Sequence, residues 1–171
     1  MLLRDILADA RETVLFPRDF YRAGADAGWG RPAAGLVLWG LAAALVDAAL
    51  TRLSGGRAAG DLVVDLLAVV FFPLLALVCA AFTTLVLHAL WRLLGGKGGL
   101  KGTWRAAGSV APAMPLIALT EPLGLFGALP WLWVYGLLAL AGEGVHGLSR
   151  RKAWGAAFLL AVLHVAAVAV R

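Results

Sequence analysis

The chain has 171 residues, of which 62% are hydrophobic and only 15% are charged, with a formal net charge of +5. A soluble domain of this length needs a polar surface over its core, so this composition excludes an ordinary soluble enzyme or binding domain and predicts an all-α integral membrane protein. The positive charge suits nucleic acid or an anionic membrane surface, and the positions of the cations along the chain favour the membrane.

Residues 1–31 contain no membrane span but carry the pattern of an amphipathic helix. Apolar side chains recur at helical spacing, and charged side chains take the opposite face. The apolar set is Leu2, Leu3, Ile6, Leu7, Ala10, Val14 and Leu15. We expect this helix to lie in the interface of the cytoplasmic leaflet. A helix that docks on a partner would show the same pattern, and that alternative stays open.

Five apolar segments follow between residues 32 and 171, and we interpret each as one transmembrane helix in a helical bundle. The predicted spans are residues 33–53, 66–92, 104–121, 124–142 and 153–170. The second lies in an apolar run longer than a bilayer requires, which predicts a tilt or a kink at Pro73. Cys79 lies in the same run, and we expect it to be a small buried hydrophobe.

The third span is the least regular, because Pro112 and Pro115 interrupt it and Glu121 ends it early. It either crosses the membrane as a broken helix or forms a re-entrant segment. In the re-entrant case the fourth and fifth spans would reverse direction, and both termini would lie on the same side.

The Lys and Arg residues test the number of spans, since cytoplasmic connections of membrane proteins are enriched in these two residues. If the chain crosses five times from a cytoplasmic N-terminus, 12 of its 15 cations lie on the cytoplasmic side. The three others are Arg52, Arg57 and Arg171. The distribution therefore predicts five spans, a cytoplasmic N-terminus and an external C-terminus.

The segment LLGGKGGLKGTWR, residues 93–105, is rich in glycine and in cations. A phosphate-binding Walker loop needs the spacing G-x-x-x-x-G-K-[ST] between a strand and a helix, and this segment has neither. We expect a mobile basic connection that contacts anionic headgroups, or a turn that only sets the topology. With the connection before the fifth span, it supplies the candidate headgroup or partner contacts Lys97, Lys101, Arg105, Arg150, Arg151 and Lys152.

The predicted spans hold few groups that could carry chemistry. The candidate functional polar or kink positions are His88, Pro73, Pro112, Pro115, Glu143 and His146. A histidine inside a span, such as His88 or His164, is expected to hydrogen-bond to a neighbouring helix, with a proton relay as the alternative. The histidines and the single cysteine are too scattered for a metal site, and no nucleophile has an assured base. We therefore predict no cofactor, no metal and no enzymatic activity.

Three motifs follow one another along nearly the whole chain: FPRDFYR, LLGGKGGLKGTWRAAGSVAPAMP and GEGVHGLSRRKAW. In this order they resemble the bacterial branch of the Yip domain family, five-helix membrane proteins named for eukaryotic relatives that interact with Ypt/Rab GTPases. The matching positions are Pro17, Phe20 and Tyr21; Gly95, Gly96, Lys97 and Gly98; Ala111, Pro112 and Pro115; and Gly142, His146, Leu148, Ser149 and Ala153. The resemblance implies the fold and residence in a bacterial cytoplasmic (inner) membrane, but it implies no settled molecular activity.

These observations predict a non-enzymatic module that organises the membrane or binds a partner through its cytoplasmic face. The expected partners are the lipid bilayer, with anionic headgroups on the cytoplasmic side, and a protein, but not nucleic acid. The alternative is a small transporter, channel or lipid-moving protein, because broken helices line substrate paths in many transporters.

Overall fold

The computed structural model describes residues 2–23, 28–55 and 62–169, which are helical almost throughout and contain no strand. The prediction of an all-α protein is therefore confirmed. The elements in chain order are α1 (Leu2–Leu15), α2 (Pro17–Arg22), α3 (Gly30–Leu53), α4 (Leu62–Leu93), α5 (Leu100–Ser109), the 3-10 segment η2 (Ala111–Ala113), α6 (Met114–Thr120), the 3-10 segment η3 (Glu121–Ala128), α7 (Leu129–His146) and α8 (Arg150–Ala169). Arg57 and Arg171, two of the cations predicted to be external, lie outside the described residues.

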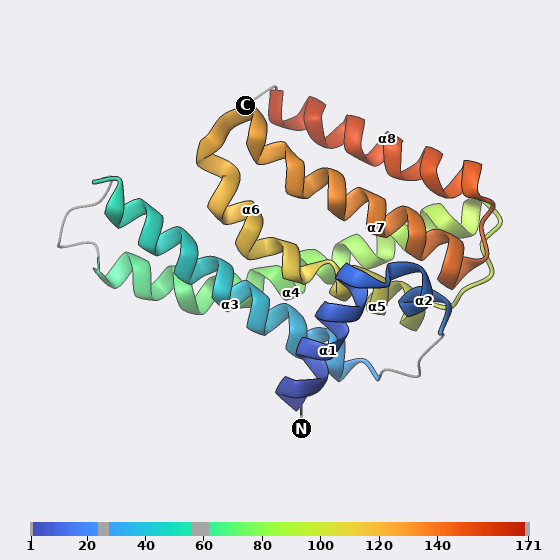
Figure 1. The fold of residues 1–171 in the computed structure, drawn as a ribbon, viewed down its shortest axis with the longest axis horizontal. Coiled ribbons are helices and arrows are strands. Elements are labelled where there is room, and N and C mark those ends of the chain that lie inside the picture. The colour runs from blue at the N-terminus through green and yellow to red at the C-terminus, as the bar shows by residue number, and fades with distance from the viewer. Residues whose placement is uncertain (1, 24–27, 56–61, 170–171) are drawn as a thin grey trace.

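The long helices run back and forth along one axis, with α3 beside α4 and α7 beside α8 (Figure 1). The segment from α5 to α6 passes between these pairs. α5 contacts α3, α4 and α7, and its residues 103–108 are all buried. The short helix α5 is thus enclosed by other helices, and the chain bends after it at Val110 and Pro112, where a missing backbone donor interrupts the α-helix.

The main core lies where α2, α4, α5 and α7 meet. Its largest fully buried side chains are Trp91 and Leu87 of α4, Tyr21 of α2 and Leu137 of α7. Because these side chains come from segments far apart in the sequence, they hold the N-terminal segment and the long helices together as one unit.

Two helices, α3 over Gly30–Leu53 and α4 over Val63–Leu93, are long and apolar enough to cross a membrane by length and composition. Large apolar side chains are exposed along α4 and α8, among them Phe71, Val78, Phe82, Phe158 and Val165. Such a surface is unfavourable in water and favourable in lipid, which is consistent with a membrane protein.

Cys79 is exposed on α4, so the expectation that it is buried was wrong. The reason is that α4 leaves much of its apolar surface outside the bundle, as its neighbour Val78 also shows. In such a helix an apolar sequence does not imply burial within the protein.

The predicted N-terminal amphipathic helix is present as α1, but one side of it packs against the bundle. Ile6 and Thr13 are buried, whereas Leu3 and Leu7 are exposed. α2 was not foreseen as a helix, and its aromatic residues are buried against α7. The N-terminal segment is therefore a part of the fold that keeps an apolar strip on its outer side.

Candidate functional site

Three polar side chains from three helices meet in the interior: His88 of α4, Thr103 of α5 and His146 of α7. The Thr103 hydroxyl oxygen lies 3.0 Å from His88 Nδ1 and 2.8 Å from His146 Nε2. His146 is 1% exposed, and its ring centroid lies 4.8 Å from that of Trp91. A hydroxyl group has one proton, so Thr103 donates to one of three neighbouring acceptors: His88 Nδ1, His146 Nε2 or the Gly99 carbonyl oxygen at 3.4 Å. The cluster therefore joins three helices through one hydroxyl group.

Burial lowers the pKa of His146 to about 4, and the nearby His88 and Arg92 act in the same direction. His146 lies beyond the predicted fourth span, in the last turn of α7. Its Nδ1 has no hydrogen-bond partner among the described residues. The ring is therefore uncharged at neutral pH and acts as a neutral hydrogen-bonding group.

The loop of residues 94–99 lies directly on His146, which corrects the expectation of a mobile connection. The Lys97 backbone N–H donates to the His146 carbonyl oxygen over 2.9 Å. A Cβ atom at Gly96 would lie 2.7 Å from the Trp91 carbonyl oxygen, and one at Gly98 would lie 2.5 Å from the Val145 carbonyl oxygen. Both separations are too short for a side chain, so glycine is required here for close backbone packing.

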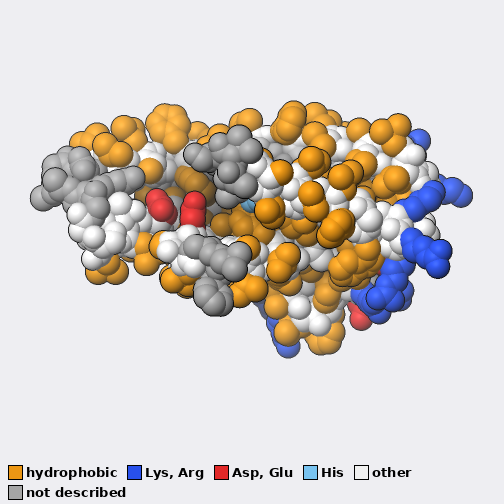
Figure 2. Space-filling view, turned by 90° about the horizontal axis from the view of Figure 1, so that it is seen from above, with side chains coloured by type: hydrophobic (Ala, Val, Ile, Leu, Met, Phe, Trp, Pro, Cys, Tyr) orange, Lys and Arg blue, Asp and Glu red, His pale blue; other side chains and the backbone are white. Residues whose placement is uncertain are grey.

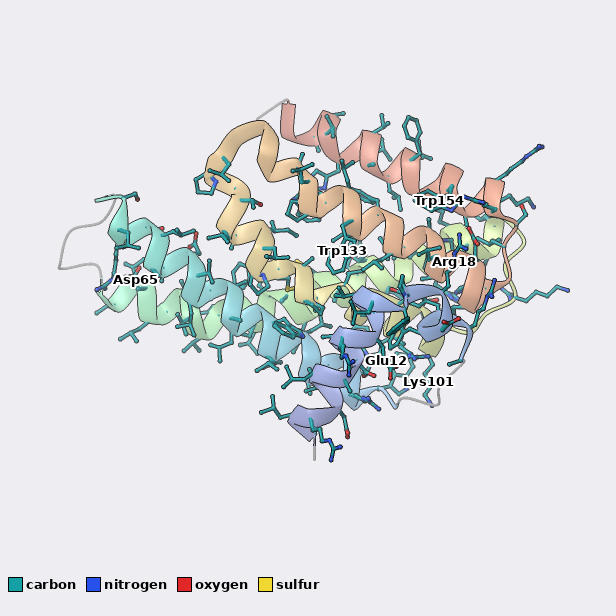
Figure 3. The ribbon with its side chains drawn as sticks, viewed as in Figure 1. Glu12, Arg18, Asp65, Lys101, Trp133 and Trp154 are labelled. Atoms are coloured by element: carbon teal, nitrogen blue, oxygen red, sulfur yellow. The ribbon has the colours of Figure 1, made fainter. Side chains whose placement is uncertain are left out.

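The predicted basic contacts, apart from Arg105, are exposed and gather at one end of the molecule. Lys and Arg side chains cluster at this end, and apolar side chains cover much of the rest of that face (Figure 2). Figure 3 places Arg18 and Lys101 at this end and Asp65 at the opposite one. The exposed cations are Lys97, Lys101, Arg150, Arg151 and Lys152. Lys152 Nζ donates to the Leu94 carbonyl oxygen over 2.7 Å, so the fold brings both predicted basic connections together.

Arg105 was predicted to belong to this surface, and the structure contradicts that position. Its side chain is buried, with 9% of the residue exposed. The guanidinium carbon lies 4.1 Å from the centroid of the Phe20 ring, and Nη2 donates to the Phe20 carbonyl oxygen over 3.1 Å. Because α5 begins at Leu100, Arg105 lies more than one turn inside a helix that is surrounded by other helices.

A second polar group connects α1 to α3 next to Arg105. Arg31 Nε lies 2.6 Å from Asp9 Oδ2, and Arg31 Nη2 lies 2.7 Å from Asp9 Oδ1. The pair is held by the hydrogen bond from Nη2, whereas Nε makes no hydrogen bond within the described residues. A cavity of about 30 Å³ adjoins it and is lined by Asp9, Arg31, Arg105, Ser109 and Pro112, among others.

The three prolines singled out in the sequence occupy different positions. Pro73 lies inside α4, which is a single helix from Leu62 to Leu93. A Cβ atom at Gly40 of α3 would lie 3.3 Å from Pro73 Cα, so the two helices approach closely there. Pro112 is in η2 beside the cavity, and Pro115 is in the first turn of α6. The break in the third helical passage is therefore where the sequence predicted it.

The remaining polar candidates connect α7 to α8. Glu143 Oε1 accepts a hydrogen bond from Trp154 Nε1 over 2.9 Å, and the Tyr135 hydroxyl lies 2.8 Å from His164 Nδ1. Within residues 2–23, 28–55 and 62–169, no three His, Cys, Asp or Glu side chains are grouped so that they could hold a metal ion. These contacts are helix-to-helix hydrogen bonds of the kind expected for His164.

Sequence reasoning missed Thr103 as the partner of the two histidines, and it missed the pairing of Asp9 with Arg31. Thr103 carried no signal, because one hydroxyl side chain in a basic loop has many equivalent interpretations. Asp9 was placed on the solvent side of the amphipathic helix, and Arg31 was counted only as a topogenic cation. Only the packing of α1 on α3 shows that these two residues pair.

The family model of the Yip1 domain matches residues 11–170 of this chain. No curated protein and no solved structure matches it. The matched range contains α2 to α8, the histidine cluster and the basic end.

Proposed function

The chain belongs to the Yip1 domain family, and on this premise we propose that it is a five-helix integral membrane protein that organises the membrane without catalysing a reaction. In this proposal it belongs to the bacterial branch of the family and resides in the cytoplasmic membrane, with its N-terminus in the cytoplasm and its C-terminus outside. Its basic end binds anionic lipid headgroups and cytoplasmic partners that are also negatively charged.

One observation carries the proposal: five exposed cations from two connections lie together at one end of a molecule whose long helices expose apolar side chains. A cation near an anionic leaflet contributes about 1 kcal/mol to membrane attraction. The five cations together therefore supply enough attraction to enrich anionic lipids around this end. They also account for its orientation, since cationic connections are retained in the cytoplasm.

The test reconstitutes the full chain in vesicles of phosphatidylcholine and phosphatidylglycerol, extracts it with a mild uncharged detergent, and measures the lipids that remain bound. The wild type should retain phosphatidylglycerol in excess of its share in the vesicle. A variant in which Lys97, Lys101, Arg150, Arg151 and Lys152 are all replaced by Gln should lose most of that excess. A matched variant with Gln at Arg4 and Arg11, exposed on α1, tests whether any cation suffices. Retention of the full excess by the five-residue variant would rule the proposal out.

A small transporter, channel or lipid-moving protein is the second candidate. It is favoured by the broken passage from α5 to α6, with Pro112 beside a cavity that two arginines line. Broken helices in transporters free backbone groups for a substrate. Flux of dye, ions or labelled lipid across vesicles that contain the wild-type chain, but not across empty vesicles, would support this candidate over the first.

A further inference from the structure

Two arginines share a single carboxylate beneath α1. Arg31 forms an ion pair with Asp9, and Arg105 is buried in the wall of the same cavity, where its charge also acts on Asp9. Glu12 lies nearby but is exposed to solvent. The charged residues that line the cavity are therefore two cations and one anion, an excess of positive charge that favours a further or a stronger anion.

Arg105 has donors to spare. A guanidinium group has five N–H donors, and within the described ranges the hydrogen bond to the Phe20 carbonyl oxygen is the one that Arg105 makes. The cavity of about 30 Å³ next to it holds about two water molecules. A larger anion must therefore take the place of the Asp9 carboxylate, which pairs with Arg31.

The Asp9 carboxylate is a weak occupant of this position. Burial raises the pKa of Asp9 even though Arg31 and Arg105 act to lower it. Ionised Asp9 is thus less favourable here than in water. A phosphate group can be bound by a guanidinium through two donors at once and carries more acceptor oxygens than a carboxylate, so it can use Arg31 Nε and the free donors of Arg105 as well.

The outer side of α1 indicates where the phosphate would come from. Leu3, Leu7 and Val14 are exposed on it, whereas Ile6 packs over the cavity. An amphipathic helix with such a strip lies at the boundary between headgroups and acyl chains. The cavity on its inner side is then at the depth of the lipid phosphates.

We propose that Arg31 and Arg105 form a binding site for the phosphate group of an anionic lipid, and that Asp9 occupies this site when the lipid is absent. This inference rests on the proposed function in that the basic end must face the lipid headgroups. Lipid entry would break the Asp9–Arg31 pair and loosen α1 from α3, so headgroup binding would control the position of the N-terminal helix.

The experiment titrates the full chain, in an uncharged detergent, with short-chain phosphatidic acid and counts bound lipid by native mass spectrometry. Asp9→Asn removes the resident anion while keeping its shape, and it should raise the affinity about tenfold. Arg105→Gln should lower the affinity about tenfold. The matched control Arg4→Gln removes an exposed cation of α1 that lies outside both the cavity and the basic end, and it should change the affinity less than about twofold.

Each outcome bears on the proposal. An affinity that Asp9→Asn leaves unchanged would overturn it, and this arm decides the matter even if Arg105→Gln fails to fold. If inorganic phosphate saturates the site at the same concentration as phosphatidic acid, the assignment of the site to a lipid is overturned. The five-cation variant of the proposed function should keep this binding, because Arg31 and Arg105 remain. If Asp9→Asn does not change the affinity for phosphatidic acid, but the five-cation variant loses its excess of bound phosphatidylglycerol, the inference fails and the proposed function stands.

Discussion

His146 illustrates, at the scale of one residue, how burial determines a protonation state. The ring is covered by Trp91 and by the backbone of the loop of residues 94–99, and it faces His88 and Arg92. A charge in this position would have no solvent and would lie near the Arg92 guanidinium, so the neutral form is favoured. The sequence identified His146 as a candidate, but its environment comes from three other segments.

This state predicts a pH dependence of stability. In the unfolded chain the imidazole binds a proton below about pH 6.5, whereas in the folded protein it does so only below about pH 4. Between these values the unfolded state binds more protons, so stability falls as the pH falls. We expect wild type to lose roughly 2–3 kcal/mol of unfolding free energy over this range. Denaturant titrations in detergent, followed by tryptophan fluorescence from pH 7.5 to 4.5, measure this loss.

The comparison variant is His146→Gln, which keeps a side-chain hydrogen-bonding group but cannot titrate. It should be less stable than wild type at pH 7.5, yet lose less stability on acidification. Parallel pH profiles for the two proteins would contradict the assignment of the loss to His146.

At the scale of elements, Gly136 and Gly144 of α7 have different surroundings. A Cβ atom at Gly144 would lie 2.7 Å from Tyr21 Cβ and 3.0 Å from the Tyr21 backbone carbon. A Cβ atom at Gly136, on the same helix, would have no heavy atom within 4 Å. The position of α2 therefore depends on the absence of a side chain at Gly144.

Gly144→Ala should destabilise the protein by about 1–3 kcal/mol, because α2 and its buried Tyr21 must move away from α7. Gly136→Ala should be neutral or stabilise the protein by up to about 1 kcal/mol, since alanine favours the helix and meets nothing. Thermal unfolding of both variants in the same detergent measures the difference. Equal melting temperatures would mean that α2 is not seated against α7 as described.

At the scale of the whole molecule, the connections lie at two ends of the bundle. The basic loop of residues 94–99 and the start of α8 are together at one end, whereas the ion pair between Arg52 and Asp65, with Nε 2.6 Å from Oδ2, is at the other (Figure 3). If the molecule spans the membrane along this axis, these ends face opposite compartments. Five crossings then require Ser54 and Leu123 to be external and Lys101 and Ser149 to be cytoplasmic.

Cysteine labelling in intact cells tests this topology. Cys79 is first replaced by Ala, and single cysteines are placed at the exposed positions Ser54, Lys101, Leu123 and Ser149. An impermeant thiol reagent should label the cysteines at Ser54 and Leu123 and leave the other two unlabelled until the cells are opened. Labelling at Ser149 with protection at Leu123 would show that the third passage is re-entrant.

The sequence by itself determined the all-α class, the family, the amphipathic α1 and the break near Pro112, because each depends on local composition, periodicity or proline geometry. Only the tertiary structure decided which polar residues meet. Arg105 is buried on Phe20, Asp9 pairs with Arg31, and Thr103 joins two histidines. Whether a charged side chain faces lipid, water or the core depends on which helices pack around it, and those helices are distant in the chain. For the same reason the glycines of the basic loop predicted mobility, although close packing against α7 is what requires them.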